Sequence, residues 1–276
     1  MNDLKGTTLS FIGTGVMAEA MIKAILDKGL IEAEWITGSG PRAERAQELE
    51  SAYGVVGTTD NHQAARAGEI VVLSVKPQVL PSVLEEIAGE IPHQSLVLSI
   101  VAGAPIKMIG GALSHDSIVR SMPNTPAQVS EGMTVWTATP EVTEEQRAQT
   151  RSILRAMGDE IYMQDEGYLD MATALSGTGP AYVFLFMEAL IDAGVHLGFS
   201  RRVSQELVLQ TMQGSVTFAR QSTLHPAELR NMVTSPGGTC AEALYQLEKG
   251  GLRTVLSRAV WAAYQKSRYI GGLGEK

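Results

Sequence analysis

The chain has 276 residues, of which 44% are hydrophobic and 19% are charged, and it carries 22 basic and 30 acidic side chains for a formal net charge of −8. This composition excludes a disordered chain, and a chain of this length buries roughly 75% of its unfolded surface without help from a metal or a disulfide. The excess of negative charge disfavours a nucleic-acid partner. The single cysteine, Cys240, excludes an intrachain disulfide, and the five histidines show no metal-ligand spacing, so no metal site is predicted.

The sequence also argues against a membrane partner. The longest unbroken apolar run, residues 181–187, is far shorter than the ~20 residues that a membrane-spanning helix needs. The first residues have no apolar stretch of the kind found in a signal peptide. We therefore expect a cytoplasmic protein.

The first half of the chain alternates short apolar runs with helical stretches. The runs are rich in Val, Ile and Leu without polar alternation, which is typical of parallel strands buried on both faces. The predicted strands are residues 8–12, 34–37, 69–75, 96–101 and 117–120, with helices such as 18–30 and 42–53 between them.

The second half has helical periodicity and few strand-like runs. Helices are predicted at residues 180–197, 201–221, 226–232, 239–249 and 252–269, and the first of them is apolar on nearly every face. The fold class is therefore α/β: a Rossmann-type domain with a mostly parallel sheet at residues 1–163, followed by an all-α domain at residues 164–276.

A glycine-rich turn follows the first predicted strand. Residues 11–18 read Phe-Ile-Gly-Thr-Gly-Val-Met-Ala, the G-x-G-x-x-A form of a dinucleotide-binding turn. Gly13 permits the tight turn and Gly15 permits close approach of a pyrophosphate, which the helix N-terminus stabilises. The predicted cofactor-binding residues here are Gly13, Thr14, Gly15, Val16 and Met17.

The end of the second predicted strand bears on which cofactor binds. An NAD site usually has an Asp or Glu there, whereas this chain reads Thr-Gly-Ser-Gly-Pro-Arg at residues 37–42. Ser39 can donate to a 2′-phosphate, and Arg42 or Arg45 can supply charge-assisted hydrogen bonds. The sequence thus favours NADP(H), with NAD(H) as the alternative. Another interpretation is that both arginines only lie on a solvated helical turn.

Two later stretches extend the predicted cofactor site. Asn61 precedes a predicted helix, and Val75, Lys76 and Pro77 end the strand at residues 69–75. Ligands of an open parallel sheet lie beyond the carboxyl ends of its strands, which places these residues along the cofactor channel. An equally simple interpretation is that Asn61 caps a helix and Pro77 starts one.

Three further motifs, together with the glycine turn, resemble those of the pyrroline-5-carboxylate reductase family. They are Arg-Ser-Met-Pro-Asn-Thr-Pro-Ala at 120–127, Ser-Gly-Thr-Gly-Pro-Ala-Tyr at 176–182 and Val-Thr-Ser-Pro-Gly-Gly-Thr-Cys-Ala at 233–241, and Val-Lys-Pro-Gln at 75–78 also matches. The resemblance runs in order from residue 11 to about residue 258. Met122, Pro123 and Asn124 in the first motif complete the predicted cofactor site.

The resemblance implies reduction of the ring C=N bond of 1-pyrroline-5-carboxylate to L-proline with hydride from NADPH. It also implies a homodimer, or a larger ring of dimers, in which the helical domains of two subunits interlock. On this resemblance, residues 1–163 are the dinucleotide-binding domain and residues 164–276 are the helical substrate and dimerisation domain. The apolar helix predicted at 180–197 has the character that such an interface requires.

The substrate of this family is a small ring with one carboxylate. Around residues 234–239, a helix start can direct backbone N–H groups at a carboxylate, and two glycines leave room for it. The predicted substrate-binding residues are Ser176, Thr234, Ser235, Gly237 and Gly238. No histidine or carboxylate is needed as a catalytic group, because hydride transfer depends mainly on positioning.

Two departures from the family pattern stand out. Cys240 occupies a position where the family commonly has a threonine that hydrogen-bonds the ring nitrogen, so Thr239 or Cys240 is the predicted catalytic residue, and a small buried cysteine is the alternative. Gly40 and Pro41 replace the Asn-Arg found in many relatives, which leaves the preference for NADPH over NADH open.

Two other functions remain open from the sequence. A β-hydroxyacid dehydrogenase shares the opening turn but uses a lysine in its second half, and residues 176–197 here contain none. A non-catalytic nucleotide-sensing regulator could use the same scaffold. The size of the oligomer, inhibition by proline and the use of another cyclic imine are also not fixed by the sequence.

Overall fold

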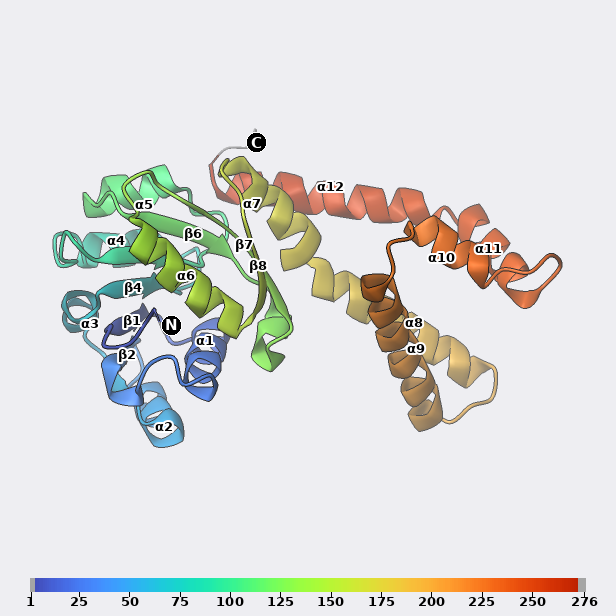
Figure 1. Ribbon diagram of the computed structural model, residues 1–276, viewed down its shortest axis with the longest axis horizontal. Helices are drawn as coiled ribbons and strands as arrows, with labels where there is room; N and C mark the ends of the chain where they lie inside the picture. Colours follow the sequence, from blue (N-terminus) through green and yellow to red (C-terminus); the bar gives the residue numbers. More distant parts are fainter. Residues whose placement is uncertain (1–2, 273–276) are drawn as a thin grey trace. The chain divides into compact units, whose positions relative to one another are not determined.

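The computed structural model describes residues 3–272, and Figure 1 follows the chain through its elements. The strands are β1 (Leu9–Ile12), β2 (Ile36–Ser39), β3 (Val56–Thr58), β4 (Ile70–Leu73), β5 (Leu96–Ser99), β6 (Ile118–Met122), β7 (Gly132–Ala138) and β8 (Gly158–Tyr162). The helices up to the second half are α1 (Val16–Asp27), α2 (Ala43–Tyr53), α3 (Asn61–Ala67), α4 (Leu80–Glu86), α5 (Ile106–Leu113), α6 (Glu144–Ala156) and α7 (Gly167–Ala172), with short 3-10 turns η1 (Ala33–Trp35) and η2 (Thr125–Val129).

The remaining elements are helical. A π-helical turn, η3 (Thr173–Gly177), is followed by α8 (Gly179–His196), α9 (Arg201–Gln221), α10 (Pro226–Met232), α11 (Thr239–Lys249) and α12 (Leu252–Ile270). The helices predicted after residue 179 agree with these bounds to within one residue at each end. No strand occurs in residues 179–262, all of which the structure describes.

The strands form one sheet in the order β3-β2-β1-β4-β5-β6-β7-β8. All neighbouring strands are parallel except β6 and β7, so β7 and β8 run opposite to the other six. The fold class predicted from the sequence, a mostly parallel Rossmann-type sheet followed by helices, is confirmed.

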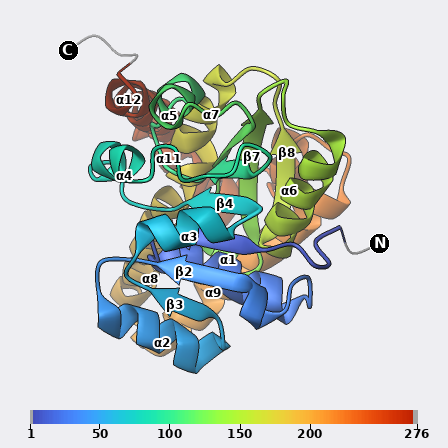
Figure 2. The ribbon, with the colours of Figure 1, turned by 90° about the vertical axis from the view of Figure 1, so that its left-hand side faces the viewer.

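A hydrophobic core lies on each face of this sheet. Figure 2 shows the sheet and the surrounding helices from a second side. Successive strand residues alternate between two clusters: Phe11 and Val72 pack with α1 and α6, whereas Ile12 and Val71 pack with α3, α4 and α5. All four side chains are at most 1% exposed. This two-sided burial explains why the central strands are apolar throughout, as the sequence suggested.

The predicted second strand needs correction, and three strands were not predicted. The second strand begins at Ile36 rather than at residue 34, because residues 33–35 form the turn η1. β3, β7 and β8 were missed. β3 has only three residues, and β8 at the sheet edge contains the acidic pair Asp159 and Glu160, so neither has the unbroken apolar run of a central strand.

By its contacts the described chain divides into two compact units. The first contains the residues up to Thr178 and those from Ala263 onward, and the second is Gly179–Ala262. The first unit therefore includes the whole sheet, α7 and the end of α12. The domain boundary after residue 163 stays a prediction.

Candidate functional site

The glycine turn lies where the sequence placed it, between β1 and α1. Gly13 has φ +103°, a backbone conformation that residues with a Cβ rarely adopt, and a Cβ there would lie 2.8 Å from Val75 Cγ1. Gly15 is the N-cap of α1 in an extended conformation, and no side chain caps this helix. A Cβ on Gly15 would meet no protein atom within 4 Å, so the space over the turn is open.

The ends of three parallel strands hold this turn. The Gly13 N–H donates to Ser39 O at the end of β2 (2.9 Å), and Ser74 Oγ, after β4, donates to Gly13 O (2.6 Å). Ser74 N also donates to Ile12 O (2.9 Å). The turn is therefore fixed before any ligand binds, which is the preorganisation that a phosphate-binding loop needs.

The two residues after Gly15 differ in exposure. The Val16 side chain is 61% exposed at the start of α1, whereas Met17 packs against the first core cluster. Ala18 is fully buried, as the third small position of the motif requires.

Ser39 and Asn61 contact each other at the same sheet edge. Ser39 is fully buried, and its hydroxyl lies 2.8 Å from Asn61 Oδ1 and 3.2 Å from Phe11 O, both of which can accept its proton. Asn61 Nδ2 donates to Glu86 Oε2 (2.9 Å). The side chain that caps α3 is that of Asp60, so Asn61 is not the N-cap and its amide is held by Ser39 instead.

The two candidate arginines have different surroundings. Arg42 is exposed at the N-cap of α2 and makes no ion pair within the described residues. Arg45, one turn later, is 18% exposed and forms ion pairs with Glu19 and Glu48. Lys76 is exposed beyond β4, and beside it Val75 and Pro77 are partly buried.

The predicted cofactor residues Met122, Pro123 and Asn124 lie next to the predicted substrate residue Ser176. Asn124 Nδ2 donates to Ser176 O (3.1 Å), and Asn124 Oδ1 accepts from Met133 N (2.9 Å). A Cβ on Gly177 would lie 2.8 Å from Met122 Cε. These contacts join the turn after β6 to the π-helical turn η3, and π-helical turns are frequent at functional sites.

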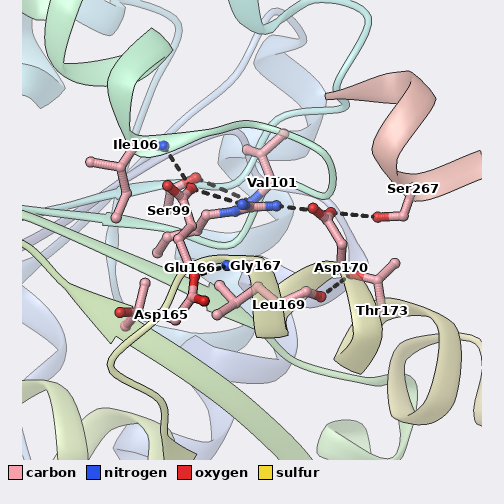
Figure 3. Close-up of polar contacts among 12 residues, drawn as sticks. Ser99, Val101, Ile106, Asp165, Glu166, Gly167, Leu169, Asp170, Thr173 and Ser267 are labelled. Carbon is pink, nitrogen blue, oxygen red and sulfur yellow. Dashed lines mark hydrogen bonds and ion pairs between the residues drawn. The ribbon is translucent and has the colours of Figure 1, made fainter. Parts of the chain in front are cut away.

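A buried ion-pair network involves α7, the helix that precedes this turn (Figure 3). Arg120, in β6, is 3% exposed, and its Nη1 donates to Glu166 Oε1 (2.7 Å) while its Nη2 lies 3.5 Å from Asp170 Oδ1. Ser267 Oγ in α12 donates to Asp170 Oδ1 (2.8 Å), and Ile106 N at the start of α5 donates to Glu166 Oε1 (2.8 Å). The network ties four segments that are distant in sequence.

The predicted substrate segment, residues 234–240, belongs to the second unit. Gly237 has φ +69°, and Gly238 is the extended N-cap of α11, which no side chain caps. Thr239 and Cys240 are therefore in the first turn of a helix whose N-terminal amides are available to a carboxylate. Thr234 Oγ1 is bound to Arg230 O (2.8 Å), and Ser235 is exposed. Cys240 is partly exposed and is a free thiol.

The residues at the glycine turn fit a dinucleotide. The open space over Gly15, the uncapped amides of α1 and the positive end of its dipole together suit a pyrophosphate. No group of three or more His, Cys, Asp or Glu side chains suited to a metal ion occurs in residues 3–272.

Sequence reasoning missed the roles of Glu19, Tyr53 and Arg120 around these sites. Arg120 stands alone inside an apolar strand, which is the one signal that could have indicated a buried ion pair. Glu19 and Tyr53 contact Arg45 or each other only because α1 and α2 lie side by side, and no sequence pattern gives that contact.

Comparisons with known proteins agree with the motifs. Residues 166–270 match the family model described as pyrroline-5-carboxylate reductase dimerisation, and residues 8–103 match the model described as NADP oxidoreductase coenzyme F420-dependent. The chain is 40% identical to pyrroline-5-carboxylate reductase from Synechocystis over 95% of this chain and 98% of that one. It is 35% identical to the Escherichia coli enzyme of the same name over 95% and 97% of the two chains.

Solved structures give the same result. The crystal structure of Plasmodium falciparum pyrroline carboxylate reductase with NADP bound matches with a TM-score of 0.90 and 35% identity, covering 97% of this chain and 99% of that chain. The Coxiella burnetii pyrroline-5-carboxylate reductase matches with a TM-score of 0.86 and 34% identity over 98% and 99%. With this similarity over nearly its whole length, the chain belongs to the pyrroline-5-carboxylate reductase family.

Proposed function

We propose that this protein reduces 1-pyrroline-5-carboxylate to L-proline with NADPH as the hydride donor. Family membership supports this reaction, and the observation that carries it in this chain is the fixed glycine turn with open space over Gly15 and uncapped amides on α1. The cofactor supplies the hydride. The protein binds and orients the two reactants, and solvent supplies the proton that the ring nitrogen gains as the hydride adds to the ring carbon.

The cofactor site uses residues from five segments that follow strands of the sheet. The pyrophosphate binds at Gly13, Thr14, Gly15, Val16 and Met17, and the adenosine end binds near Ser39, Arg42 and Asn61. Val75, Lys76 and Pro77, with Met122, Pro123 and Asn124, line the rest of the dinucleotide. The hydrogen bond of Asn124 to Ser176 supports this placement, because it brings the last cofactor residues beside a substrate residue.

The substrate carboxylate binds at the start of α11. The backbone amides at the start of α11 and the hydroxyl of Ser235 hold the carboxylate without a formal positive charge, and Gly237 and Gly238 leave room for it. Thr234 and Ser176 are the other two residues that we assign to substrate binding. Thr239 or Cys240 donates to the ring nitrogen. The left-handed conformation of Gly237 and the uncapped start of α11 support this assignment.

The protein acts as a homodimer or a ring of dimers in the cytoplasm. The helical stretch Gly167–His196 passes a length-and-composition test for a membrane span, with a mean hydropathy of 1.4, although its longest unbroken apolar run is only seven residues. No residue of α8 is buried within one chain. Because the dimerisation model covers this stretch, a second copy of the chain is the cover that we propose for it.

Steady-state oxidation of NADPH by the purified protein tests the function. With 1-pyrroline-5-carboxylate present, NADPH absorbance should fall and L-proline should appear in equal amount. Cofactor binding without turnover would reject the enzyme and favour a nucleotide-sensing regulator. Faster turnover with a larger or smaller cyclic imine would keep the reaction class and change the substrate.

A further inference from the structure

The guanidinium group of Arg45 is already bound to other groups of the protein. Its Nε donates to Thr14 O in the glycine turn (3.1 Å), its Nη1 donates to Glu48 Oε2 (3.0 Å), and its Nη2 is paired with Glu19 Oε2. All three guanidinium nitrogens therefore have partners, and the side chain is only 18% exposed. A 2′-phosphate would have to compete with these contacts for Arg45.

Glu19 needs a positive partner because of its position. It lies in the first turn of α1, at the helix end that the glycine turn offers to a pyrophosphate. A carboxylate so near a diphosphate repels it, and the repulsion grows where water is displaced. Although partial burial opposes ionisation, hydrogen bonds from Arg45 and Tyr53 keep the pKa of Glu19 below its ordinary value, so the residue is charged at neutral pH.

The bond to Thr14 O also orients the turn. In a planar trans peptide the C=O and the following N–H point in opposite directions. With Thr14 O directed at Arg45, the N–H of Gly15 is directed away from Arg45. The Thr14 side chain lies close to the backbone that follows β2, since a Cβ on Gly40 would lie 2.8 Å from Thr14 Oγ1.

Arg42 has the opposite character. It is exposed, it begins α2 just beyond the end of β2, and it has no ion-pair partner within the described residues. The neighbouring Gly40 and Pro41 offer no charge of their own. Arg42 is thus the cation at this strand end that is available to an external phosphate group.

We infer that Arg45 is a positioning residue, which orients the glycine turn and cancels the charge of Glu19 for NADPH and NADH alike, whereas Arg42 is the residue that recognises the 2′-phosphate. The inference rests on the proposed placement of the dinucleotide at the glycine turn. From the sequence alone, either arginine could bind the 2′-phosphate, whereas the inference gives the two arginines different roles.

Dissociation constants for NADPH and NADH, measured by calorimetry without substrate, test the division. Arg42→Gln should weaken NADPH roughly tenfold, the size of one charge-assisted hydrogen bond, and leave NADH within about twofold. Arg45→Gln should weaken both cofactors by the same factor, again roughly tenfold. A loss confined to NADPH in Arg45→Gln would overturn the inference.

The double variant Glu19→Gln with Arg45→Gln separates charge cancellation from direct ligation. Removing the carboxylate should restore most of the affinity that Arg45→Gln loses, for both cofactors. If Arg45 were a phosphate ligand, the double variant would bind NADPH as weakly as the single one, and the inference would be wrong.

Two controls keep the result interpretable. If Arg45→Gln does not fold, as judged by circular dichroism, Arg45→Lys replaces it. A lysine keeps the charge but cannot bind Thr14 O and Glu19 together, so the affinities for both cofactors should fall equally and by less than in Arg45→Gln. A loss of affinity for NADPH alone would contradict the inference. A wild-type protein that binds neither cofactor would reject the proposed function itself. If the wild type binds both cofactors but the variants do not show the expected losses of affinity, only this inference is rejected.

Discussion

Ser235 is exposed in front of α11, where its hydroxyl is available to the substrate carboxylate. Ser235→Ala should raise the KM for 1-pyrroline-5-carboxylate several-fold and change kcat little, because a contact made equally in ground and transition states affects binding alone. Steady-state kinetics at saturating NADPH measure this. Ser215→Ala, in α9, is the matched control, since that hydroxyl is bound to Thr211 O within its own helix. An unchanged KM in Ser235→Ala would mean that the carboxylate binds elsewhere.

Cys240 stands in the first turn of α11. The resemblance to the family implies that relatives commonly have a threonine at this position. A hydroxyl is a stronger donor than a thiol, so Cys240→Thr should leave kcat equal or raise it. The measurement is kcat at saturating concentrations of both reactants. A collapse of kcat would show that the thiol has a role that a hydroxyl cannot take.

The charge of Glu19 gives a prediction about pH. The folded-state pKa of Glu19 is depressed, so its contribution to stability is present above the pKa of the unfolded chain and is lost as the pH falls through the folded-state value. Wild type should therefore have a higher Tm than Glu19→Gln at pH 7, and the difference should begin to fall as the pH drops below about 4.3, the ordinary pKa of a glutamate, and vanish below the folded-state pKa. Thermal unfolding at several pH values and one protein concentration measures it. A difference that stays constant or grows as the pH is lowered from 7 to about 2 would contradict the ion pair with Arg45.

At the level of single residues, the sequence identified backbone roles better than side-chain partners. Gly13 and Gly15 could be predicted because their conformations are local properties of a turn. The ion pair of Arg45 with Glu19 could not be predicted, because the two residues are 26 positions apart and meet only when α1 packs beside α2.

The same contrast holds for whole elements. Strands β1, β4 and β5 are buried on both faces, so their apolar runs reveal them. β7 and β8 are outer strands with polar residues, and their reversed direction depends on pairing with β6, which no local pattern contains. The long helices after residue 179 could be predicted almost to the residue, since helical periodicity is local.

The ion-pair network around Arg120 connects β6, α5, α7 and α12, so the loss of one of its charges should lower the stability of the fold. Asp170→Asn removes a charge that is 5% exposed and paired with Arg120 and Ser267. Leaving Arg120 less compensated should lower the free energy of unfolding by about 3–5 kcal/mol. Urea denaturation at fixed protein concentration measures the change.

An exposed ion pair provides the control for that experiment. Arg202 and Glu206 in α9 form a pair at 2.8 Å with side chains 77% and 64% exposed. Arg202→Gln should cost less than about 1 kcal/mol, because exposed pairs are screened by solvent. If Asp170→Asn and Arg202→Gln lowered the free energy of unfolding equally, the ion pairs of Arg120 would be screened by solvent like an exposed pair.

At the scale of the whole molecule, the second unit has too little core of its own. In α8 the side chains of Phe184 and Leu185 are 60% and 67% exposed within one chain, and Leu197 just after it is 80% exposed. Surfaces of this kind are stable in water only when another surface covers them. The sequence indicated an apolar helix here, but no local pattern says which surface covers it, and a second chain is the cover that we propose.

Leu185→Glu should therefore shift the protein from a dimer or larger assembly toward monomers, because a buried carboxylate without a partner is costly in an apolar interface. Sedimentation velocity measures the mass, and Trp35→Gln, which changes an exposed aromatic side chain in the turn η1 before β2, is the matched control that should keep the assembly intact. Calorimetry adds a second readout. Because the glycine turn and its supports belong to the first unit, the Leu185→Glu monomer should still bind NADPH while losing turnover. A Leu185→Glu protein of unchanged mass would show that α8 is not the interface.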